Sequence, residues 1–258
     1  MIIDTHTHLG FKNGLKGTAK ELVSSMDAAG IDKAMVFAGD IFDCPTTRLL
    51  EEVKVHPDRL YPIASVTMNS AKDQARHRLR LEALNTWFKT NQIFGLKFYT
   101  GYEHFYPSEE DLVPYFKLLI KYNKPAIFHS GDTFNCCKGA KLKYAKPIHI
   151  DDPATDYPEL KIIIAHMGSP WVIDAGEVVY KNSNVYADCS GFVYGSFDEI
   201  QKSRFQKAVD QFLEIANDPN RLFFGSDWPI CDQKSYVETF KNCNSEDLNR
   251  VVMKVFGI

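Results

Sequence analysis

Two histidines near the N-terminus have a spacing that suits metal binding. His6 and His8 end an apolar run that begins at Met1, and one residue separates them. Side chains at positions i and i+2 of a β-strand lie on the same face, so both imidazoles can reach one ion. The sequence therefore predicts part of a metal site in the first strand.

Three further residues of metal-binding type end later apolar runs. His129 ends Ala-Ile-Phe-His, His166 follows Ile-Ile-Ala, and Asp227 follows Phe-Phe-Gly-Ser. Nitrogen and carboxylate ligands in this mixture suit Zn²⁺ best, with iron, manganese or cobalt as alternatives. A lone histidine is more often an ordinary hydrogen-bonded residue. Five ligand-type residues at the ends of predicted strands favour a catalytic metal site instead.

A repeating unit brings these residues to one edge. Short apolar runs rich in β-forming residues end in polar residues, and a helical pattern follows each run. The expected strands are residues 1–8, 33–38, 60–67, 93–99, 125–129, 161–166, 184–190 and 222–227. Their starts recur about every 32 residues, close to the size of one βα unit. The sequence therefore predicts a (β/α)8 TIM barrel, in one domain over residues 1–258, with its active site at the C-terminal ends of the strands.

Helix signals lie between these runs. Thr18 and Glu21 have capping-box spacing, and Gly30 is expected to end that helix. A second helix is expected to open over 108–111 and to end near Asn123. Three more helical patterns cover 71–90, 197–216 and 245–256. The longest irregular stretch, 131–157, follows the fifth strand and is expected to lie over the barrel mouth.

Composition excludes several classes of protein. The 258 residues are 45% hydrophobic and 24% charged, as in ordinary globular proteins. The formal charge is -3, and no basic run is interleaved with aromatic residues, so nucleic acid is not an expected partner. We found no apolar stretch long enough to span a bilayer and no targeting signal, and we expect a cytoplasmic protein. The six cysteines are expected to be free thiols. For the adjacent Cys136 and Cys137, a redox or second-metal role is the alternative.

Three motifs resemble a known family. Residues 3–8 read Ile-Asp-Thr-His-Thr-His, residues 157–161 lead into Ile-Ala-His-Met-Gly at 164–168, and residues 224–229 read Phe-Gly-Ser-Asp-Trp-Pro. Together they are similar to the amidohydrolase superfamily, in particular the amidohydrolase-related branch that includes aromatic-acid decarboxylases and lactonases. The resemblance covers nearly the whole chain.

The resemblance implies roles for the five residues. His6, His8 and His129 would bind the metal, and Asp227 would bind it or transfer protons beside it. His166 would be a catalytic group that activates water or polarises the substrate. The cofactor implied is a divalent metal ion, with zinc expected.

Lys97 leaves three roles open. Alternation in 93–99 points Lys97 and Tyr99 into the barrel, where an unpaired lysine is costly. As in some members of the superfamily, Lys97 would be carboxylated and bridge two metal ions. Alternatively, it anchors a substrate carboxylate or forms a structural ion pair.

Aromatic residues also follow the ends of the expected strands. We expect Lys97, Tyr99, Trp171 and Trp228 to contact the substrate, with plain packing as the alternative for the aromatic residues. Asp188 and Ser190 end the seventh expected strand, where they line the pocket or form a turn.

These features favour an enzyme. Water activated by the metal would cleave a C–N or C–O bond of a small amide, lactone or similar carbonyl compound, and Asp227 would take the proton. The nearest alternative is a metal-dependent decarboxylase of an aromatic or unsaturated acid. A nuclease fits less well. Barrel nucleases with a similar His-x-His motif in the first strand resemble a pattern with glutamate in the fourth strand, where this chain has Lys97. A barrel that binds a metal or metabolite without turnover is the non-catalytic alternative. The expected partner is a small-molecule substrate, and a homodimer is possible.

Overall fold

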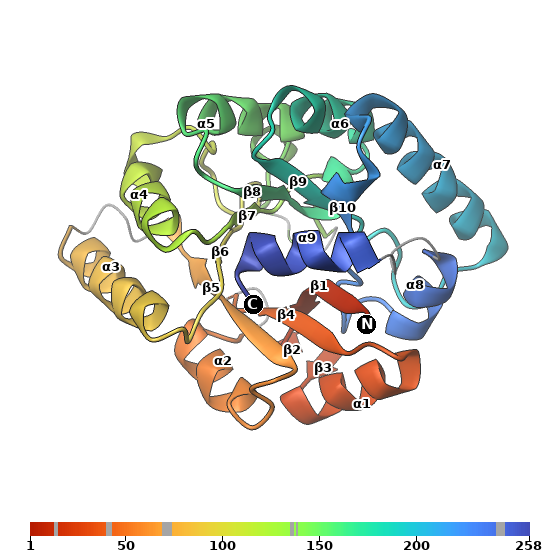
Figure 1. Cartoon of the computed structure of the whole chain (residues 1–258), viewed down its shortest axis with the longest axis horizontal. Helices are drawn as coiled ribbons and strands as arrows, with labels where there is room; N and C mark the ends of the chain where they lie inside the picture. Colours follow the sequence, from red (N-terminus) through yellow and green to blue (C-terminus); the bar gives the residue numbers. More distant parts are fainter. Residues whose placement is uncertain (13–14, 40–42, 69–73, 135–136, 138, 241–245) are drawn as a thin grey trace.

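Eight parallel strands form one closed barrel in the computed structural model of this protein (Figure 1). The structure describes residues 1–258 except 13–14, 40–42, 69–73, 135–136, 138 and 241–245. The strands of the barrel, in spatial order, are β1 (Ile3–His8), β4 (Lys33–Phe37), β5 (Leu60–Val66), β6 (Leu96–Phe98), β7 (Ala126–Phe128), β8 (Ile162–Ile164), β9 (Val185–Asp188) and β10 (Leu222–Phe223).

Backbone hydrogen bonds between the first strand and the segment that follows the last strand close the barrel. The Thr5 amide donates to the Phe224 carbonyl at 2.9 Å, and the His8 amide donates to the Trp228 carbonyl at 2.7 Å. Each strand end therefore lies beside its neighbours around one rim, as the predicted (β/α)8 TIM barrel requires. That prediction of the fold is confirmed.

Helices surround the barrel in Figure 1, and one helix closes its end. The helices are α1 (Ala19–Ala29), α2 (Thr46–Val53), α3 (Gln74–Lys89), α4 (Val113–Tyr122), α5 (Asp151–Asp156), α6 (Val172–Lys181), α7 (Glu199–Ala216), α8 (Gln233–Thr239) and α9 (Glu246–Phe256). Helix α9 crosses the barrel opening, where Val252 and Phe256 pack with inward-facing residues such as Ile3 and Ile163. With this end covered, a site must lie at the opposite, C-terminal end.

The predicted helix ends are mostly confirmed. Thr18 and Glu21 form both hydrogen bonds of a capping box at the start of α1, and Gly30 ends that helix with a φ of 72°. Asn123 ends α4 in the left-handed conformation, but a 3-10 turn over Glu110–Leu112 precedes the helix, which starts only at Val113. The predicted helix over 71–90 is described from Gln74, and the start of the helix over 245–256 lies partly outside the described residues.

Several elements were not predicted. A short hairpin of β2 (Gly10–Lys12) and β3 (Leu15–Gly17) follows β1, and the region 131–157 contains α5 and two 3-10 turns instead of being irregular throughout. Strand β8 ends at Ile164, two residues before the expected end, because the backbone turns at His166 with a φ of 61°. These elements are short, and a few residues of pattern do not separate them from loops.

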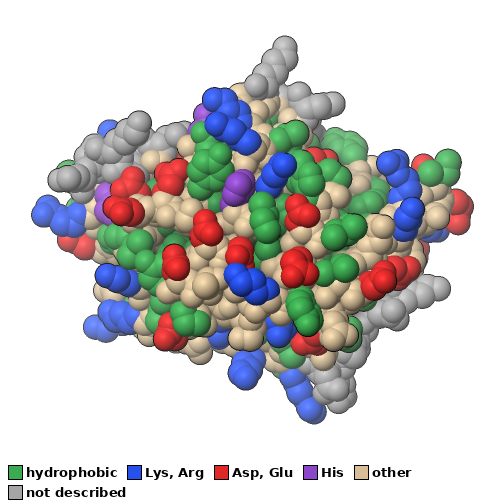
Figure 2. All heavy atoms as spheres, turned by 90° about the horizontal axis from the view of Figure 1, so that it is seen from above, with side chains coloured by type: hydrophobic (Ala, Val, Ile, Leu, Met, Phe, Trp, Pro, Cys, Tyr) green, Lys and Arg blue, Asp and Glu red, His purple; other side chains and the backbone are tan. Residues whose placement is uncertain are grey.

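No helix among the described residues is long and apolar enough to cross a membrane. On the face drawn in Figure 2, acidic and basic side chains are interspersed. The described cysteines, Cys44, Cys137, Cys189 and Cys231, are free thiols. Cys136 lies outside the described residues.

Candidate metal centre

An irregularity in β1 decides which way its polar residues point. Asp4 pairs with Ala34 of β4, but the register shifts before Thr7 pairs with Val36. Such bulges re-aim side chains. Asp4 consequently lies outside the barrel, where Gln233 of α8 donates to its carboxylate at 2.9 Å. His6 and His8 face the barrel interior, where the ring of Phe37 packs against both of them.

His6, His8 and Asp227 come together at the rim. One ligand atom from each residue lies within 4.8 Å of the other two. The Oδ1 atom of Asp227 is 3.2 Å from Nε2 of His8 and 3.7 Å from Nε2 of His6. Nδ1 of His6 donates to Asp188 at 2.8 Å, which leaves Nε2 of His6 as an acceptor. The structure thus brings three of the four predicted metal ligands into one cluster.

Asp227 carries the feature that best suits a cation. It is buried, and its Oδ1 atom has no hydrogen-bond partner among the described residues. A buried carboxylate oxygen without a partner is costly unless a cation balances it. Burial raises the pKa of Asp227, and the nearby charge of Lys97 opposes this shift. The residues present therefore fit a divalent metal held by His6, His8 and Asp227.

His129, the fourth predicted ligand, lies beside this cluster. Its Nδ1 atom donates to the Thr100 carbonyl at 2.8 Å, and its ring centre is 5.2 Å from that of His166. It is not part of the group of three whose ligand atoms lie within 4.8 Å of one another. Burial, and next the charge of Lys97, lower its pKa to about 3, so its ring is neutral near pH 7.

His166 follows β8 in a left-handed backbone conformation that places its ring next to the cluster. The centres of the His166 and His6 rings are 4.7 Å apart. A non-glycine residue with positive φ is uncommon, and both His166 (61°) and Asp227 (69°) adopt it here. Backbone strain of this kind is concentrated at functional sites. Burial holds the pKa of His166 well below its ordinary value.

Lys97 points into the barrel, as its strand pattern predicted. It is buried, and its Nζ atom is 3.4 Å from Nε2 of His6 and 4.9 Å from the centre of the Phe37 ring. Burial lowers the pKa of Lys97 to about 8, while the charges of Asp188 and Asp227 oppose the shift. The lysine thus lies next to the predicted ligands.

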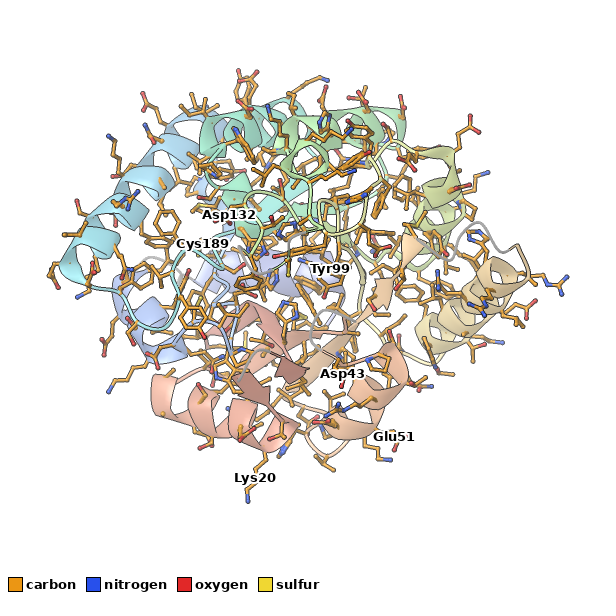
Figure 3. All side chains as sticks on the ribbon, turned by 180° about the vertical axis from the view of Figure 1, so that it is seen from behind. Lys20, Asp43, Glu51, Tyr99, Asp132 and Cys189 are labelled. Atoms are coloured by element: carbon orange, nitrogen blue, oxygen red, sulfur yellow. The ribbon has the colours of Figure 1, made fainter. Side chains whose placement is uncertain are left out.

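A cavity of about 430 Å³ opens beside the cluster. Its described lining is Tyr102, His129, Asp132, Thr133, Phe134, His166, Gly191, Phe192, Val193, Tyr194, Asp227 and Ile230. In Figure 3, which is drawn from the face opposite α9, Asp132 and Tyr99 are labelled toward the middle of the molecule. Sequence reasoning missed Asp132, although its place three residues after His129 puts it at the same rim. Burial raises the pKa of Asp132, and the Asp227 charge adds to this shift.

The four predicted substrate contacts are not in the described lining of this cavity. The Tyr99 hydroxyl donates to the Ala38 carbonyl at 2.7 Å, and the Trp228 ring packs against Gly17. Trp171 precedes α6, with the Lys146 ammonium 5.5 Å from its ring centre. Substrate contact by Lys97, Tyr99, Trp171 and Trp228 stays a prediction.

Asp4 is a second residue that sequence reasoning missed. Its carboxylate accepts hydrogen bonds from the amide and hydroxyl of Ser226, the amide of His6 and the side chain of Gln233. Burial raises the pKa of Asp4 to about 6, although these four hydrogen bonds act to lower it. Asp4 thus joins the strand that carries His6 to the segment that carries Asp227. The sequence signal that could have identified Asp4 was a charged residue within the otherwise apolar start of its strand.

Comparisons with known proteins agree with this architecture. A probable 2-pyrone-4,6-dicarboxylic acid hydrolase from Acinetobacter baumannii, solved with citric acid, is 18% identical, with a TM-score of 0.74 over 100% of this chain and 99% of that chain. An amidohydrolase from Burkholderia multivorans with bound zinc is 14% identical, with a TM-score of 0.71 over 100% and 99%. A dihydroxybenzoic acid decarboxylase from Polaromonas with bound manganese is 16% identical, with a TM-score of 0.67 over 99% and 96%. At these identities the likeness shows the shared fold.

A sequence search of curated proteins finds no match. The family model described as amidohydrolase, in contrast, matches residues 3–254, which is nearly the whole chain. The match runs along the chain from the first barrel strand, which carries His6 and His8, past the last strand and the segment with Asp227. The chain belongs to the amidohydrolase family.

Proposed function

We propose that this protein is a metal-dependent hydrolase that cleaves a C–N or C–O bond of a small carbonyl compound. The observation that carries the proposal is the convergence of His6, His8 and the partnerless Oδ1 of Asp227 next to the cavity. His129 would complete the ligand set. Zinc in one structural neighbour and manganese in another support a divalent metal. When bound, such an ion activates water and polarises a carbonyl group.

In this proposal Asp227 is the group that moves a proton. It is a ligand candidate that also lines the cavity, so its carboxylate can take a proton from the attacking water molecule. The same group can then return the proton to the nitrogen or oxygen atom that leaves. His166 lines the same cavity as a second proton-holding group.

The charge of the cavity wall favours a neutral substrate. Its described lining has two carboxylates, Asp132 and Asp227, and no lysine or arginine. With Asp227 bound to the metal, a carboxylated ring would still meet the like charge of Asp132, whereas a neutral amide or lactone would not. We therefore place hydrolysis ahead of decarboxylation.

Decarboxylation is the second candidate, and Lys97 is the observation that favours it. Its ammonium group lies next to His6 and could balance a substrate carboxylate held close to the metal ligands. Decarboxylases are also among the structural neighbours. In this reaction Asp227 or His166 would supply a proton to carbon.

One experiment separates the candidates. The protein is purified without chelator, its metal content is measured, and metal-loaded and stripped samples are assayed against lactones, amides and aromatic carboxylic acids. Ring opening or amide cleavage that depends on the metal supports the hydrolase. Release of carbon dioxide that depends on the metal would replace it with the decarboxylase. A protein that binds no metal, or keeps full activity without it, would overturn both.

A further inference from the structure

The carboxylate of Asp188 connects two of the site histidines. Its Oδ2 atom accepts the Nδ1 hydrogen bond of His6 at 2.8 Å. Its Oδ1 atom accepts from the backbone amides of His166 at 3.0 Å and Ser190 at 3.1 Å. The Ser190 hydroxyl also contacts Oδ1. Because Oδ1 faces two amide hydrogens, it acts only as an acceptor, and the Ser190 hydroxyl must donate its single hydrogen to it.

This arrangement determines the direction of the hydrogen bond between Ser190 and His166. The Ser190 Oγ atom lies 2.8 Å from Nδ1 of His166, and the Ser190 carbonyl oxygen lies 3.2 Å from the same nitrogen. With its hydrogen already given to Asp188, the hydroxyl can only accept from His166. A carbonyl oxygen also only accepts. Both neighbours of Nδ1 are therefore acceptors, and the proton of the neutral ring belongs on Nδ1.

Close packing keeps the ring in this place. A Cβ atom added to Gly191 would lie 2.6 Å from Nδ1 of His166 and 3.0 Å from a carboxylate oxygen of Asp227. The backbone of Gly191, at a φ of 69°, therefore closes one side of the imidazole. The ring has little room to move away from Ser190.

We infer that Asp188 and Ser190 are positioning residues that hold His166, a residue of the cavity lining, in its Nδ1–H tautomer, so that Nε2 carries the lone pair. A neutral His166 then accepts a proton from water or substrate and does not donate one to a carbonyl oxygen. In that step the O–H electron pair stays on the oxygen and the proton bonds to Nε2. The chemical use rests on the proposed function, whereas the tautomer does not. Among the two roles expected for His166, this arrangement selects activation of water.

The tautomer can be measured directly by NMR. Protein labelled with ¹⁵N at histidine gives long-range nitrogen–proton spectra that distinguish the two tautomers, and a His166→Asn variant assigns the signal. We expect the Nδ1–H form in the metal-free and zinc-loaded protein. In Ser190→Ala we expect the Nε2–H form to appear in a measurable fraction. Ser190→Thr restores the hydroxyl and should restore the wild-type spectrum.

Ser226→Ala is the matched control. Ser226 is a buried serine whose hydroxyl donates to an aspartate, Asp4, and accepts from the Trp228 amide, so its described hydrogen bonds do not involve a histidine ring. This variant should leave the His166 tautomer unchanged. An Nε2–H form in the wild-type protein would overturn the inference. A spectrum of Ser190→Ala identical to that of the wild type would remove the positioning role of Ser190.

Failure of the proposed function has a different signature. Zinc titration and hydrolysis assays test that function, and a negative result there leaves the His166 spectrum as it is. With an active hydrolase, Ser190→Ala should lower kcat about tenfold with little change in KM, because the substrate-binding wall is intact. An unchanged kcat together with a changed tautomer would overturn the role of His166 as proton acceptor.

Discussion

The Nε2 atom of His8 lies 3.2 Å from the Oδ1 atom of Asp227, although the two residues come from opposite ends of the chain. Closure of the barrel creates this contact, since the backbone of Asp227 also donates to the His6 carbonyl at 2.8 Å. An imidazole nitrogen and a carboxylate oxygen held this close, deep in the protein, share either a cation or a proton. The first prediction concerns the cation.

His8→Ala and Asp227→Asn should each weaken zinc binding by about two orders of magnitude or more, since even the partners of metal ligands contribute about 10- to 100-fold. Competition with a chelating dye measures the dissociation constant. His104→Ala is the control, because His104 is exposed and its ring bonds to the Gly139 carbonyl. Unchanged zinc affinity in both site variants would contradict the assigned ligands.

Lys97→Met should tighten zinc binding about tenfold. The ammonium of Lys97 is 3.4 Å from Nε2 of His6, and its charge contributes to the lowered pKa of His6, His8 and His129. Removing a positive charge beside a cation site is favourable, and tenfold corresponds to about 1.4 kcal/mol. Weaker binding, or the loss of a second metal that depends on bicarbonate, would instead indicate that a carboxylated Lys97 is a ligand.

Much of this site could be predicted from the spacing of residues within one strand. The rest depends on contacts that form only when the strands assemble into the closed barrel. The spacing of His6 and His8 predicted their shared orientation because two residues of a strand determine it. Asp4 has the same spacing from His6, yet the irregularity in β1 turns it to the outside. Nothing in the local sequence marks that irregularity.

The same limit applies to the fold. Helices with a capping box, such as α1, were predicted because side chain and backbone interact within one turn. The partners of His166 were not predicted, because Ser190 and Asp188 reach it only once β9 lies beside β8. Asp132 follows β7 in a region expected to be irregular, where no period marks which side chains face the cavity.

Asp4→Asn should lower the free energy of unfolding by about 2 kcal/mol, because the amide cannot accept all four hydrogen bonds that the carboxylate receives. Urea denaturation followed by circular dichroism measures the loss. Asp58→Asn is the matched control, since Asp58 is exposed and should change stability by less than about 0.5 kcal/mol. Equal stability of the two variants would show that the Asp4 network is dispensable.

The contribution of Lys124 to the free energy of unfolding should increase as the pH rises above 8. Its Nζ atom donates to the carbonyls of Phe256 and Gly257 at the end of α9, and burial lowers its pKa from 10.5 to about 8. Between these two pH values the unfolded chain binds more protons at this residue than the folded protein does, so stability increases with pH. The expected gain from pH 8 to 9.5 is about 1 kcal/mol.

Lys124→Met provides the comparison for this pH dependence. The variant should be less stable at pH 8 by about 1 kcal/mol, because two carbonyls lose a donor. More specifically, its stability should lack the gain that the wild-type protein shows between pH 8 and 9.5. Parallel curves for the two proteins would exclude Lys124 as the source of that gain.

Asp132→Asn should change which substrates the cavity accepts. Asp132 lies in the cavity wall, and the described lining has no lysine or arginine to offset it. For an anionic substrate, removing this charge should lower KM about threefold, since a like-charge interaction in a solvated wall amounts to about 1 kcal/mol or less. Dihydrocoumarin and a carboxylated dihydrocoumarin form a suitable pair, because the ring to be opened is the same.

The control variant is Asp156→Asn, at an exposed position outside the cavity lining. The neutral lactone should show no change in KM with either variant. Equal changes for both lactones would mean that Asp132 shapes the cavity and does not select substrates by charge.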